Sequence, residues 1–288
     1  MKPYEVLYIC GHGHSGSTIL DIVLGSSPNA FSAGEVSYII RDGFLKEYCS
    51  CGAKIGECPQ WKPIFDEWFA EMEIEFGRYR ALRATYEGNK ATFRVLWNLF
   101  FPSKSWKMYV RATEQLYEAI HAHTGASRII DSSKPATRIA LLRQFTRVRP
   151  IHLMRNFAGV LNSEKKDVKA NIKRGIESSS PPKATRRVLA SWLSTNASCM
   201  VFGLLFGAKR LTFKSFVARP DTLRRFNPDL GANLASATFT TEHMVAGNAI
   251  RMKPAHRLET GRISTYARLS PRERILARIV DAVFWFWN

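Results

Sequence analysis

A run of glycines and hydroxyl residues near the start of the chain is the clearest chemical signal in the sequence. Gly11-His12-Gly13-His14-Ser15-Gly16-Ser17-Thr18 lies between an apolar stretch at 6–10 and a second one at 18–24. A strand, a glycine loop and a helix in this order direct backbone N–H groups and the positive end of the helix at an anion. Residues 13–18 therefore predict an anion-binding loop, and the alternative is a tight turn with incidental glycines.

The loop matches two phosphate-binding patterns only in part. Its three glycines fit the G-x-G-x-x-G of dinucleotide-binding proteins, which also need an acid about 20 residues on, at the end of a second strand. Glu35 has that spacing, but residues 30–34 are a poor central strand. The P-loop pattern of kinases needs a lysine where Ser17 stands. Each pattern fails at one important position.

Polar residues also follow two later apolar runs. Asp131-Ser132-Ser133-Lys134 ends the first of these runs, and Arg155 directly follows the second, with Ser163 eight residues further on. In open α/β sheets, ligands bind beyond the carboxyl ends of the strands. Arg155 and Ser163 therefore predict a second anion site, away from the glycine loop, although each alone also fits a structural salt bridge or helix contact.

These loops need a framework that brings strand ends together. Short apolar runs that predict strands lie at 6–10, 128–131, 151–154 and 211–213. Apolar residues at helical spacing predict helices at 18–24, 61–76, 106–123 and 139–145. Strands separated by helices predict an α/β, P-loop-like three-layer fold with a central parallel sheet flanked by helices. With 288 residues the chain can bury its own core, and we expect 1–288 to form a single domain.

The segment 164–187 differs in composition from the rest of the chain. Its cations are Lys165, Lys166, Lys169, Lys173, Arg174, Lys183, Arg186 and Arg187. Ser178-Ser179-Ser180-Pro181-Pro182 interrupts them and predicts a loop. Two interpretations stay open: a mobile basic lid over a bound anion, or a solvated surface insertion.

The net charge of +18 favours anionic partners, which include nucleic acid, anionic lipid and phosphorylated small molecules. A nucleic-acid-binding protein with a degenerate P-loop would interleave basic residues with exposed aromatic ones. The aromatic residues here fall mostly on helical faces that we expect to be buried. The tryptophans expected in the core are Trp61, Trp68, Trp97 and Trp106. We therefore expect no nucleic-acid partner.

The apolar runs do not predict a membrane span. Ile19–Leu24 and Val280–Trp287 are too short or too interrupted for the roughly 20 residues that cross a bilayer. The N-terminus shows neither a basic leader nor a small-residue cleavage site, so we expect a cytoplasmic location.

Three of the five cysteines cluster as C-x-C-x6-C, namely Cys49, Cys51 and Cys58. Zinc sites in proteins usually take four ligands from paired motifs. The spacing here differs, and the nearest histidines lie far away in the sequence. The pattern therefore favours a reversible disulfide or plain packing, and we assign no metal ligand.

Taken together, these motifs resemble those of the bacterial-type sulfotransferases that use 3′-phosphoadenosine 5′-phosphosulfate (PAPS). This family is related to the carbohydrate and tyrosylprotein sulfotransferases. The resemblance covers nearly the whole chain and depends on the order and spacing of short motifs. These are 13–18, Ala33-Gly34-Glu35, Cys49-Ser50-Cys51-Gly52, Cys58-Pro59-Gln60-Trp61, Asp131-Ser132-Ser133-Lys134, His152-Leu153-Met154-Arg155 with Ser163, and His243 with Gly247-Asn248 and Arg251.

The resemblance implies roles for particular residues. The 5′-phosphosulfate is held by the loop Gly13, His14, Ser15, Gly16, Ser17 and Thr18. Arg155 and Ser163 hold the 3′-phosphate, Glu35 is the general base, and Arg251 lies in a late loop over the nucleotide. Two departures stand out: His14 replaces the usual Arg or Lys, and Phe213-Lys214-Ser215 replaces a frequent Tyr-Glu-Asp.

The implied reaction moves a sulfuryl group to a hydroxyl, less readily to an amine, of a small-molecule or glycan acceptor and releases 3′,5′-ADP. Such a transfer is governed by positioning and electrostatics, by analogy with phosphoryl transfer. Lys134 and His14 are the candidates that neutralise the leaving group, and the reaction needs no metal. The alternative is a P-loop kinase or phosphotransferase, which would use ATP and Mg²⁺ with Asp131 as a metal ligand.

Overall fold

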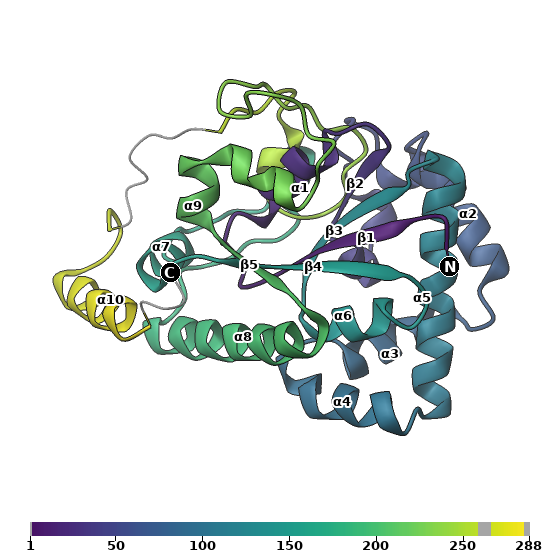
Figure 1. Ribbon diagram of the computed structural model, residues 1–288, viewed down its shortest axis with the longest axis horizontal. Helices are drawn as coiled ribbons and strands as arrows, with labels where there is room; N and C mark the ends of the chain where they lie inside the picture. The colour runs from purple at the N-terminus through teal and green to yellow at the C-terminus, as the bar shows by residue number, and fades with distance from the viewer. Residues whose placement is uncertain (1, 259–265, 285–288) are drawn as a thin grey trace.

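A five-stranded parallel sheet forms the centre of the molecule, with helices on both faces (Figure 1). The computed structural model describes residues 2–258 and 266–284. The strands are β1 (Glu5–Cys10), β2 (Ala30–Gly34), β3 (Arg128–Lys134), β4 (Arg147–Met154) and β5 (Lys209–Thr212). Their order in the sheet is β2-β3-β1-β4-β5, and every neighbouring pair is parallel. The predicted α/β class is therefore confirmed.

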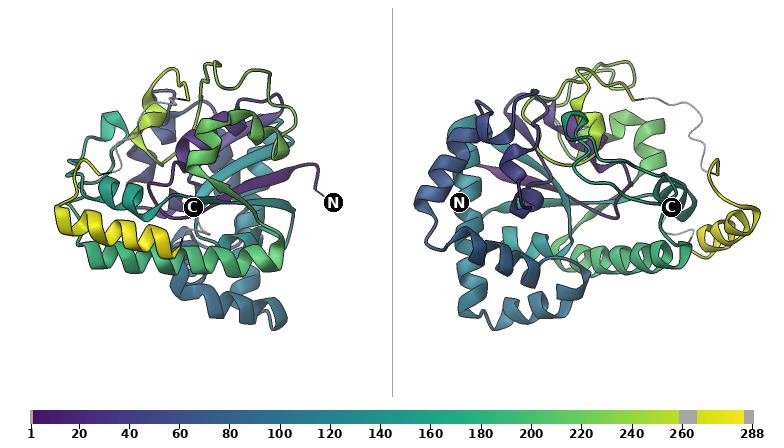
Figure 2. Two further views of the ribbon diagram at one scale, coloured as in Figure 1. Left: turned by 60° about the vertical axis from the view of Figure 1, so that its left-hand side comes forward. Right: turned by 180° about the vertical axis from the view of Figure 1, so that it is seen from behind.

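The helices fall into groups around this sheet (Figures 1 and 2). They are α1 (Ser17–Gly25), α2 (Trp61–Glu71), α3 (Phe76–Tyr86), α4 (Thr92–Phe100), α5 (Lys104–Thr124), α6 (Thr137–Leu142), α7 (Phe157–Glu164), α8 (Thr185–Phe206), α9 (Phe213–Ala218) and α10 (Pro271–Val283). Helices α1 and α9 cover one face of the sheet, and α5, α6 and α8 cover the other.

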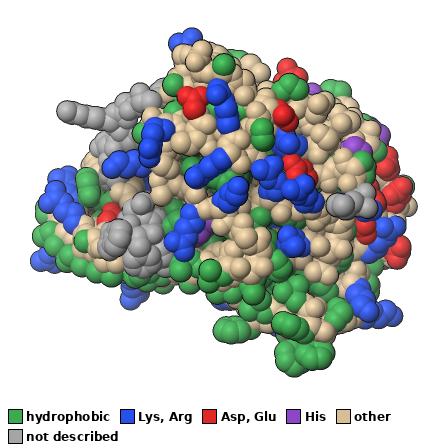
Figure 3. Space-filling model, viewed as in Figure 1, with side chains coloured by type: hydrophobic (Ala, Val, Ile, Leu, Met, Phe, Trp, Pro, Cys, Tyr) green, Lys and Arg blue, Asp and Glu red, His purple; other side chains and the backbone are tan. Residues whose placement is uncertain are grey.

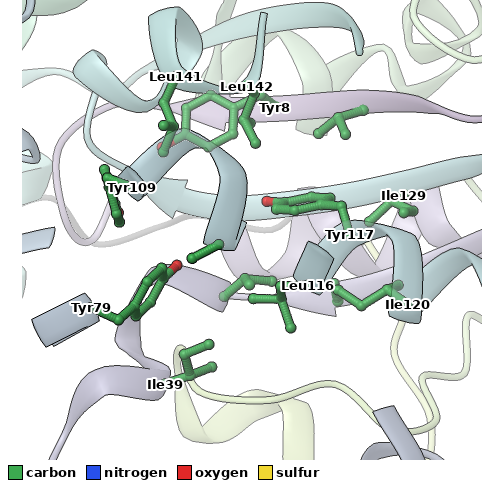
Figure 4. Close-up of a cluster of buried hydrophobic side chains, with 14 of the residues drawn as sticks. Tyr8, Ile39, Tyr79, Tyr109, Leu116, Tyr117, Ile120, Ile129, Leu141 and Leu142 are labelled. Carbon is green, nitrogen blue, oxygen red and sulfur yellow. The ribbon is translucent and has the colours of Figure 1, made fainter. Parts of the chain in front are cut away.

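The central strand β1 shows why the sheet is buried on both sides. Val6, Tyr8 and Cys10 pack into the core beneath α5 and α6, while Leu7 and Ile9 pack into the core beneath α1 and α9. Successive side chains of a strand point to opposite faces, so a continuous apolar run fits a strand covered on both sides. The larger of the two cores is shown in Figure 4, where Tyr8 of β1 lies near Leu141 and Leu142 of α6.

The predicted helix over 61–76 is two helices. Helix α2 ends at Glu71, Met72 adopts an extended backbone, and α3 begins at Phe76. The break lets rings from the two helices meet, because Phe76 lies edge-on to Trp68 with the ring centres 6.1 Å apart. A single straight helix cannot make this contact, so tertiary packing of aromatic side chains overrides the helical pattern.

Two strand boundaries also differ from the prediction. Strand β3 runs to Lys134 and not only to Asp131, so Ser132, Ser133 and Lys134 are strand residues instead of a following loop. Residues 30–34 do form a strand, but β2 lies at the edge of the sheet, which agrees with its weak central-strand character. The last strand ends at Thr212, and Phe213 begins α9.

The segment 165–184 connects α7 to α8 as a loop with isolated antiparallel bridges between Val168 and Ser180 and between Asn171 and Ile176. The Ser-Pro stretch is indeed irregular. Helix α8 starts at Thr185, however, so Arg186 and Arg187 belong to a helix and not to the loop. The loop within the basic segment 164–187 therefore ends at residue 184, before the start of α8.

Helix α8 is the one helix of the described residues that is long and apolar enough to cross a membrane by length and composition, with a mean hydropathy of 1.5 over its best window. A third of that window is buried in the protein. The apolar run Val280–Trp287 contributes 280–283 to α10, and residues 285–287 lie outside the described residues.

Candidate active site

The glycine loop joins β1 to α1 through two residues with left-handed backbones. His14 has φ 63° and Gly16 has φ 93°. A side chain at position 16 would also collide with the ring of Phe213, because a Cβ there would lie 2.5 Å from that ring. Only glycine meets both conditions without strain. The loop therefore leads into α1 with Gly16 at its N-cap, and within the described chain no side chain caps this helix.

The loop opens onto a cavity of about 450 Å³ at the carboxyl ends of the strands, within the range of ligand pockets. Its lining comes from seven separate stretches of the chain. The lining residues are Gly13, His14, Gly16, Ser17, Thr18, Ile19, Glu35, Lys134, Arg155, Ser163, Phe213, Gly247, Asn248 and Ile250. The structure thus brings together nearly all of the predicted site residues. Ser15 lies within the same loop, buried, and its hydroxyl lacks a hydrogen-bond partner among the described residues.

Glu35 and Lys134 meet in this cavity although 99 residues separate them in the sequence. Lys134 ends β3 with a left-handed backbone, φ 84°, and its ammonium donates to Glu35 Oε1. The backbone N–H of Glu35 donates to the Val245 carbonyl at 3.0 Å, which fixes the carboxylate against a late loop. Two charged groups are thereby held in a small cavity by backbone and side-chain contacts.

Arg155 and Ser163 are also neighbours, as their spacing predicts. Arg155 follows β4, Ser163 lies near the end of α7, and Arg155 Nη1 lies 3.4 Å from Ser163 Oγ. The same nitrogen donates to the His14 carbonyl at 2.7 Å, and the guanidinium lies 4.9 Å from the centre of the Phe213 ring. These contacts hold a planar cation beside the glycine loop, an arrangement that suits a phosphate.

Burial disfavours the charged form of both loop histidines. The pKa of His14 lies below its ordinary value because the imidazole is partly buried, although the Glu164 carboxylate 3.7 Å away raises it. Burial also lowers the pKa of His12, whose Nε2 lies 3.1 Å from Ser191 Oγ. Of the two leaving-group candidates, His14 is thus the one whose charged form burial disfavours, whereas the Lys134 ammonium pairs with the Glu35 carboxylate.

Arg251 lies outside the lining of the cavity. Its side chain is fully buried and donates to the carbonyls of Gly175, Gly247 and Tyr48, and it pairs with Glu177. Arg251 therefore connects three segments by hydrogen bonds: the 165–184 loop, the late loop around residues 245–251, and the backbone at residue 48. A direct nucleotide contact by Arg251 remains a prediction from the resemblance.

Asp131 does not face the cavity. Its carboxylate is fully buried, accepts from Tyr117, and lies 3.0 Å from Arg138 Nε. Arg138 in turn pairs with Glu87, so the Asp131 carboxylate belongs to a buried ionic network with Arg138 and Glu87. A kinase would need this carboxylate at the phosphates, where it would hold Mg²⁺. The geometry of Asp131 therefore counts against the kinase alternative.

Phe213, Gly247 and Asn248 are lining residues to which the sequence analysis assigned no role. A Cβ on Gly247 would lie 3.3 Å from both Glu35 Oε1 and Thr18 Oγ1, and the N–H of Asn248 donates to Thr18 Oγ1 at 3.2 Å. In the sequence, Gly247-Asn248 stands out only as part of the family motif that includes Arg251. Phe213 was noted only as a departure from the Tyr-Glu-Asp pattern.

The cysteine cluster has a histidine neighbour after all. His243 Nδ1 lies 3.2 Å from Cys58 Sγ, although 185 residues separate them. The five cysteines, all of them among the described residues, are free thiols in this structure, which agrees with packing and not with a disulfide among the two interpretations given above. Of the four tryptophans expected in the core, Trp61, Trp68 and Trp106 are buried, whereas Trp97 is exposed on α4, where that expectation is wrong.

Comparison with known proteins gives one informative result. No family model matches the chain, and no curated protein matches it. Among solved structures, a "Sulfotransferase Domain from the Curacin Biosynthetic Pathway" aligns with a TM-score of 0.53 and 12% sequence identity, over 98% of each chain. The chain has a sulfotransferase-like fold. At this level of identity the similarity concerns the fold, and the chemistry has to be argued from the site itself.

Proposed function

We propose that the protein transfers the sulfuryl group of PAPS to a hydroxyl acceptor, less readily to an amine, and releases 3′,5′-ADP. One observation carries the proposal: a single cavity holds two separate anion-binding sets, the glycine loop with the start of α1 and the Arg155–Ser163 pair. PAPS carries anionic groups at two positions, a phosphosulfate at the 5′ end and a phosphate at the 3′ carbon. The sulfotransferase-like fold supports the same assignment.

The glycine loop suits the 5′ phosphosulfate. The uncapped start of α1 leaves backbone N–H groups for an anion, and the helix adds a partial positive charge there. The buried, unpartnered hydroxyl of Ser15 gives a further donor. Ser17 occupies the position of the kinase lysine, so the loop binds through backbone and hydroxyl groups.

Arg155 suits the 3′-phosphate. Phe213 stacks on its guanidinium and Ser163 lies beside it, so its orientation is set before a ligand arrives. A preorganised arginine binds phosphate through two parallel hydrogen bonds and loses little side-chain entropy on binding. This residue would distinguish 3′,5′-ADP from nucleotides that lack a 3′-phosphate.

Glu35 and Lys134 would act at opposite ends of the transfer. As the acceptor oxygen bonds to sulfur, Glu35 takes the hydroxyl proton, and the bond from sulfur to the bridging phosphate oxygen breaks. The electron pair of that bond leaves with 3′,5′-ADP, where the Lys134 ammonium and the loop N–H groups stabilise it. Positive charge at the leaving group thus comes from the chain itself, so the proposed reaction needs no metal.

The direct contact between Lys134 and Glu35 adds a condition to this mechanism. The Lys134 ammonium occupies Oε1 of Glu35 in this structure, so that oxygen cannot accept a proton from an acceptor at the same time. When Lys134 turns to the bridging oxygen of the donor, Glu35 becomes free to accept a proton from the acceptor. Donor binding would therefore prepare the base, and acceptor deprotonation would follow donor binding.

Ligand-dependent thermal stability tests the proposal. A ligand that binds only the native state raises the melting temperature. We expect 3′,5′-ADP to raise it more than 5′-AMP, ATP with Mg²⁺, or an oligonucleotide at equal concentration. A larger shift with ATP and Mg²⁺ would favour a kinase. Transfer of labelled sulfate from PAPS to a panel of small-molecule and glycan acceptors then identifies the acceptor class.

The cytoplasmic location expected from the sequence is a separate prediction.

A further inference from the structure

Four side chains with metal-binding atoms converge outside the cavity. They are Cys49, Cys51, Cys58 and His243, and their ligand atoms all lie within 4.8 Å of one another. Cys49 and Cys58 are buried, His243 is half-buried and Cys51 is exposed. Three thiols and one imidazole form a ligand set that proteins use for structural zinc.

The separations fit a tetrahedron. Two sulfurs bound to one zinc ion at about 2.3 Å lie about 3.8 Å apart, and a sulfur and a nitrogen lie about 3.5 Å apart. Here Cys51 Sγ and Cys58 Sγ are 3.7 Å apart, and Cys58 Sγ is 3.2 Å from His243 Nδ1. Bonded sulfurs in a disulfide would be about 2.05 Å apart. The spacing therefore matches shared coordination of an ion and not a covalent pair.

The backbone around the sulfurs is arranged for thiolates. Tyr48 and Lys54 pair as an antiparallel bridge, and between them Gly52, with φ 88°, closes a tight turn by donating to the Cys49 carbonyl. The backbone N–H groups of Cys51, Ala53, Gln60 and Trp61 lie beside the three sulfurs. Backbone N–H groups in such positions would offset the negative charge of thiolate ligands.

The histidine is equally fixed. His243 has a left-handed backbone, φ 61°, and its carbonyl accepts from the indole N–H of Trp61. Next to it, the N–H of Met244 donates to Ser50 Oγ at 2.8 Å, and the Ser50 N–H donates to the Met244 carbonyl. Residues 49–51 and 243–244 are thus joined by hydrogen bonds on both sides of the four ligand atoms.

We propose that Cys49, Cys51, Cys58 and His243 bind one structural zinc ion. Four protein ligands fill a tetrahedral site and leave no position for substrate, so the ion would serve stability and not the transfer reaction. The ion would connect the turn at residues 48–54 to His243, at the start of the late loop. Val245 and Gly247 of that loop contact Glu35. Its effect on the active site, though not its existence, rests on the proposed function.

Metal content tests the site independently of sulfuryl transfer. We expect protein purified under reducing conditions without chelator to hold about one zinc ion per chain by inductively coupled plasma mass spectrometry. Cys51→Ser, at the exposed ligand, should lower this content at least about fivefold, while Cys199→Ala, a buried cysteine far from the cluster, should retain it. His243→Cys keeps four ligands and should also retain zinc.

A second readout covers variants that fold poorly. Co²⁺ added to the metal-free wild-type protein should give the visible absorption of tetrahedral cobalt with thiolate ligands, and Zn²⁺ should raise the melting temperature. The proposal fails if the wild type binds no zinc after zinc saturation, if Cys51→Ser binds as much as wild type, or if the mass of the unreduced protein shows a disulfide among these cysteines.

A separate observation concerns the outer surface of α4, α8 and α10. Large apolar side chains are exposed there, among them Phe93 (85%), Leu204 (81%), Phe100 (77%) and Trp97 (64%). Figure 3 shows apolar side chains gathered along the edge of the molecule over these helices. Ile275, Ile279 and Val283 of α10 are exposed as well. Single exposed apolar residues are ordinary, but a contiguous set marks an interaction surface.

The charges around this surface indicate its partner. Helices α4 and α8 contain Arg94, Arg186 and Arg187 and no acidic residue. Of the two acids of α10, Glu273 pairs with Lys165, and Asp281 accepts from the N–H groups of Phe157 and Ala158 at the start of α7. A second copy of this chain is a poor partner for this surface, because each copy has a net charge of +18 and the two copies would repel each other.

From this combination of exposed apolar side chains and uncompensated cations, we infer that the α4–α8–α10 surface docks on an anionic lipid bilayer. Aromatic and aliphatic side chains beside arginines are typical of helices that lie in the bilayer interface. Trp192, Asn196 and Phe202 on the inner side of α8 are buried in the protein, so α8 would lie along the membrane and not cross it.

Vesicle sedimentation tests this surface with the charge held constant. We expect binding to phosphatidylcholine vesicles that contain phosphatidylserine, and at least about a tenfold loss of affinity when Trp97→Ser and Leu204→Ser are combined. Leu45→Ser, at an exposed apolar residue elsewhere, is the control. Equal binding by the double variant would show that charge alone acts. Dimerisation or oligonucleotide binding that the double variant abolishes, with vesicles unbound, would assign the surface to a protein or nucleic-acid partner and overturn the inference.

Discussion

The ammonium of Lys134 contacts the carboxylate of Glu35 inside the cavity, and this contact joins the ends of β2 and β3. These strands are neighbours in the sheet, with Gly34 paired to Asp131, so their carboxyl ends deliver the two residues to one place. An ion pair in a small cavity is a functional arrangement when each partner has a separate task. The first two predictions separate those tasks.

Replacing Glu35 with Gln keeps the shape of the side chain and removes the proton acceptor. We expect kcat for sulfuryl transfer to fall by about 10²–10⁴-fold, the usual contribution of a positioned base, while the Kd for 3′,5′-ADP changes little. Single-turnover transfer and calorimetric titration measure the two quantities. Glu73→Gln, at an exposed glutamate, is the matched control. If the Glu35 variant transfers at the wild-type rate, the base is another residue, with His12 or His14 the next candidate.

Lys134→Ala should lower kcat as well, for a different reason. Without the ammonium, the bridging oxygen of the leaving group develops charge with less stabilisation. The defect should therefore shrink when the donor carries a leaving group of lower pKa, whereas the Glu35→Gln defect should not. Comparing the two variants on PAPS and on such an analogue makes the distinction, and an equal defect on both donors would assign Lys134 to another step.

Arg155→Ala should weaken 3′,5′-ADP much more than 5′-AMP, because only the first ligand carries the phosphate that loses its partner. A charge-assisted contact of this kind is worth about 1.5–3 kcal/mol, or roughly 10–150-fold in Kd. Isothermal titration of both nucleotides gives the comparison. Arg147→Ala, at an exposed arginine of β4, serves as the control. Equal weakening of both ligands would contradict the assignment of the 3′ site.

The loop 165–184 is expected to become less accessible when 3′,5′-ADP binds. Its residues Gly175 and Glu177 contact Arg251 next to the late loop, so the loop is already attached to one wall of the cavity. Limited trypsin digestion should cut at its lysines, and saturating 3′,5′-ADP should slow the cleavage several-fold. If cleavage proceeds at the same rate with and without nucleotide, the loop is a surface insertion and no lid.

Asp21 gives the protein a pH dependence that has nothing to do with turnover. The carboxyl is fully buried against Ser32 and Ser132, and burial raises its pKa to about 7. Between its ordinary pKa near 3.8 and this value, the unfolded state loses the proton that the native state keeps. The free energy of unfolding therefore falls as pH rises, by up to about 1.4 kcal/mol per pH unit from this group.

Asp21→Asn removes the titrating proton and keeps the size of the side chain. We expect its melting temperature relative to wild type to rise between pH 5 and pH 8. The control is Asp229→Asn, whose carboxylate is largely exposed. A difference between Asp21→Asn and wild type that is the same at both pH values would show that Asp21 has an ordinary pKa in the native protein.

The local parts of the site were readable from sequence because they depend on neighbours along the chain. The glycine loop needs only β1 before it and α1 after it, and Arg155 and Ser163 need only one strand end and one short helix. The sheet class followed from apolar runs for the same reason. Such local patterns predict how segments within a few tens of residues of one another are arranged.

The other parts depend on contacts across the whole chain, which no local pattern contains. His243 reaches Cys58 over 185 residues, and because of this distance the sequence pattern alone favours a disulfide or plain packing over a metal site. Asp131 follows an apolar run as a catalytic residue would, yet Arg138 and Tyr117 bury it. Trp97 has the spacing of a core residue, but the helix that carries it turns that face outward.

The late loop also sets the order in which the site can form during synthesis. Thr18 and Glu35 emerge from the ribosome early, but Asn248 and Val245, which hold them, are translated more than two hundred residues later. A nascent chain that ends at β5 already contains every strand of the sheet while its cavity still lacks a wall. These contacts can therefore form only near the end of translation, and under the proposed function a nascent chain that stops at β5 should bind the donor weakly.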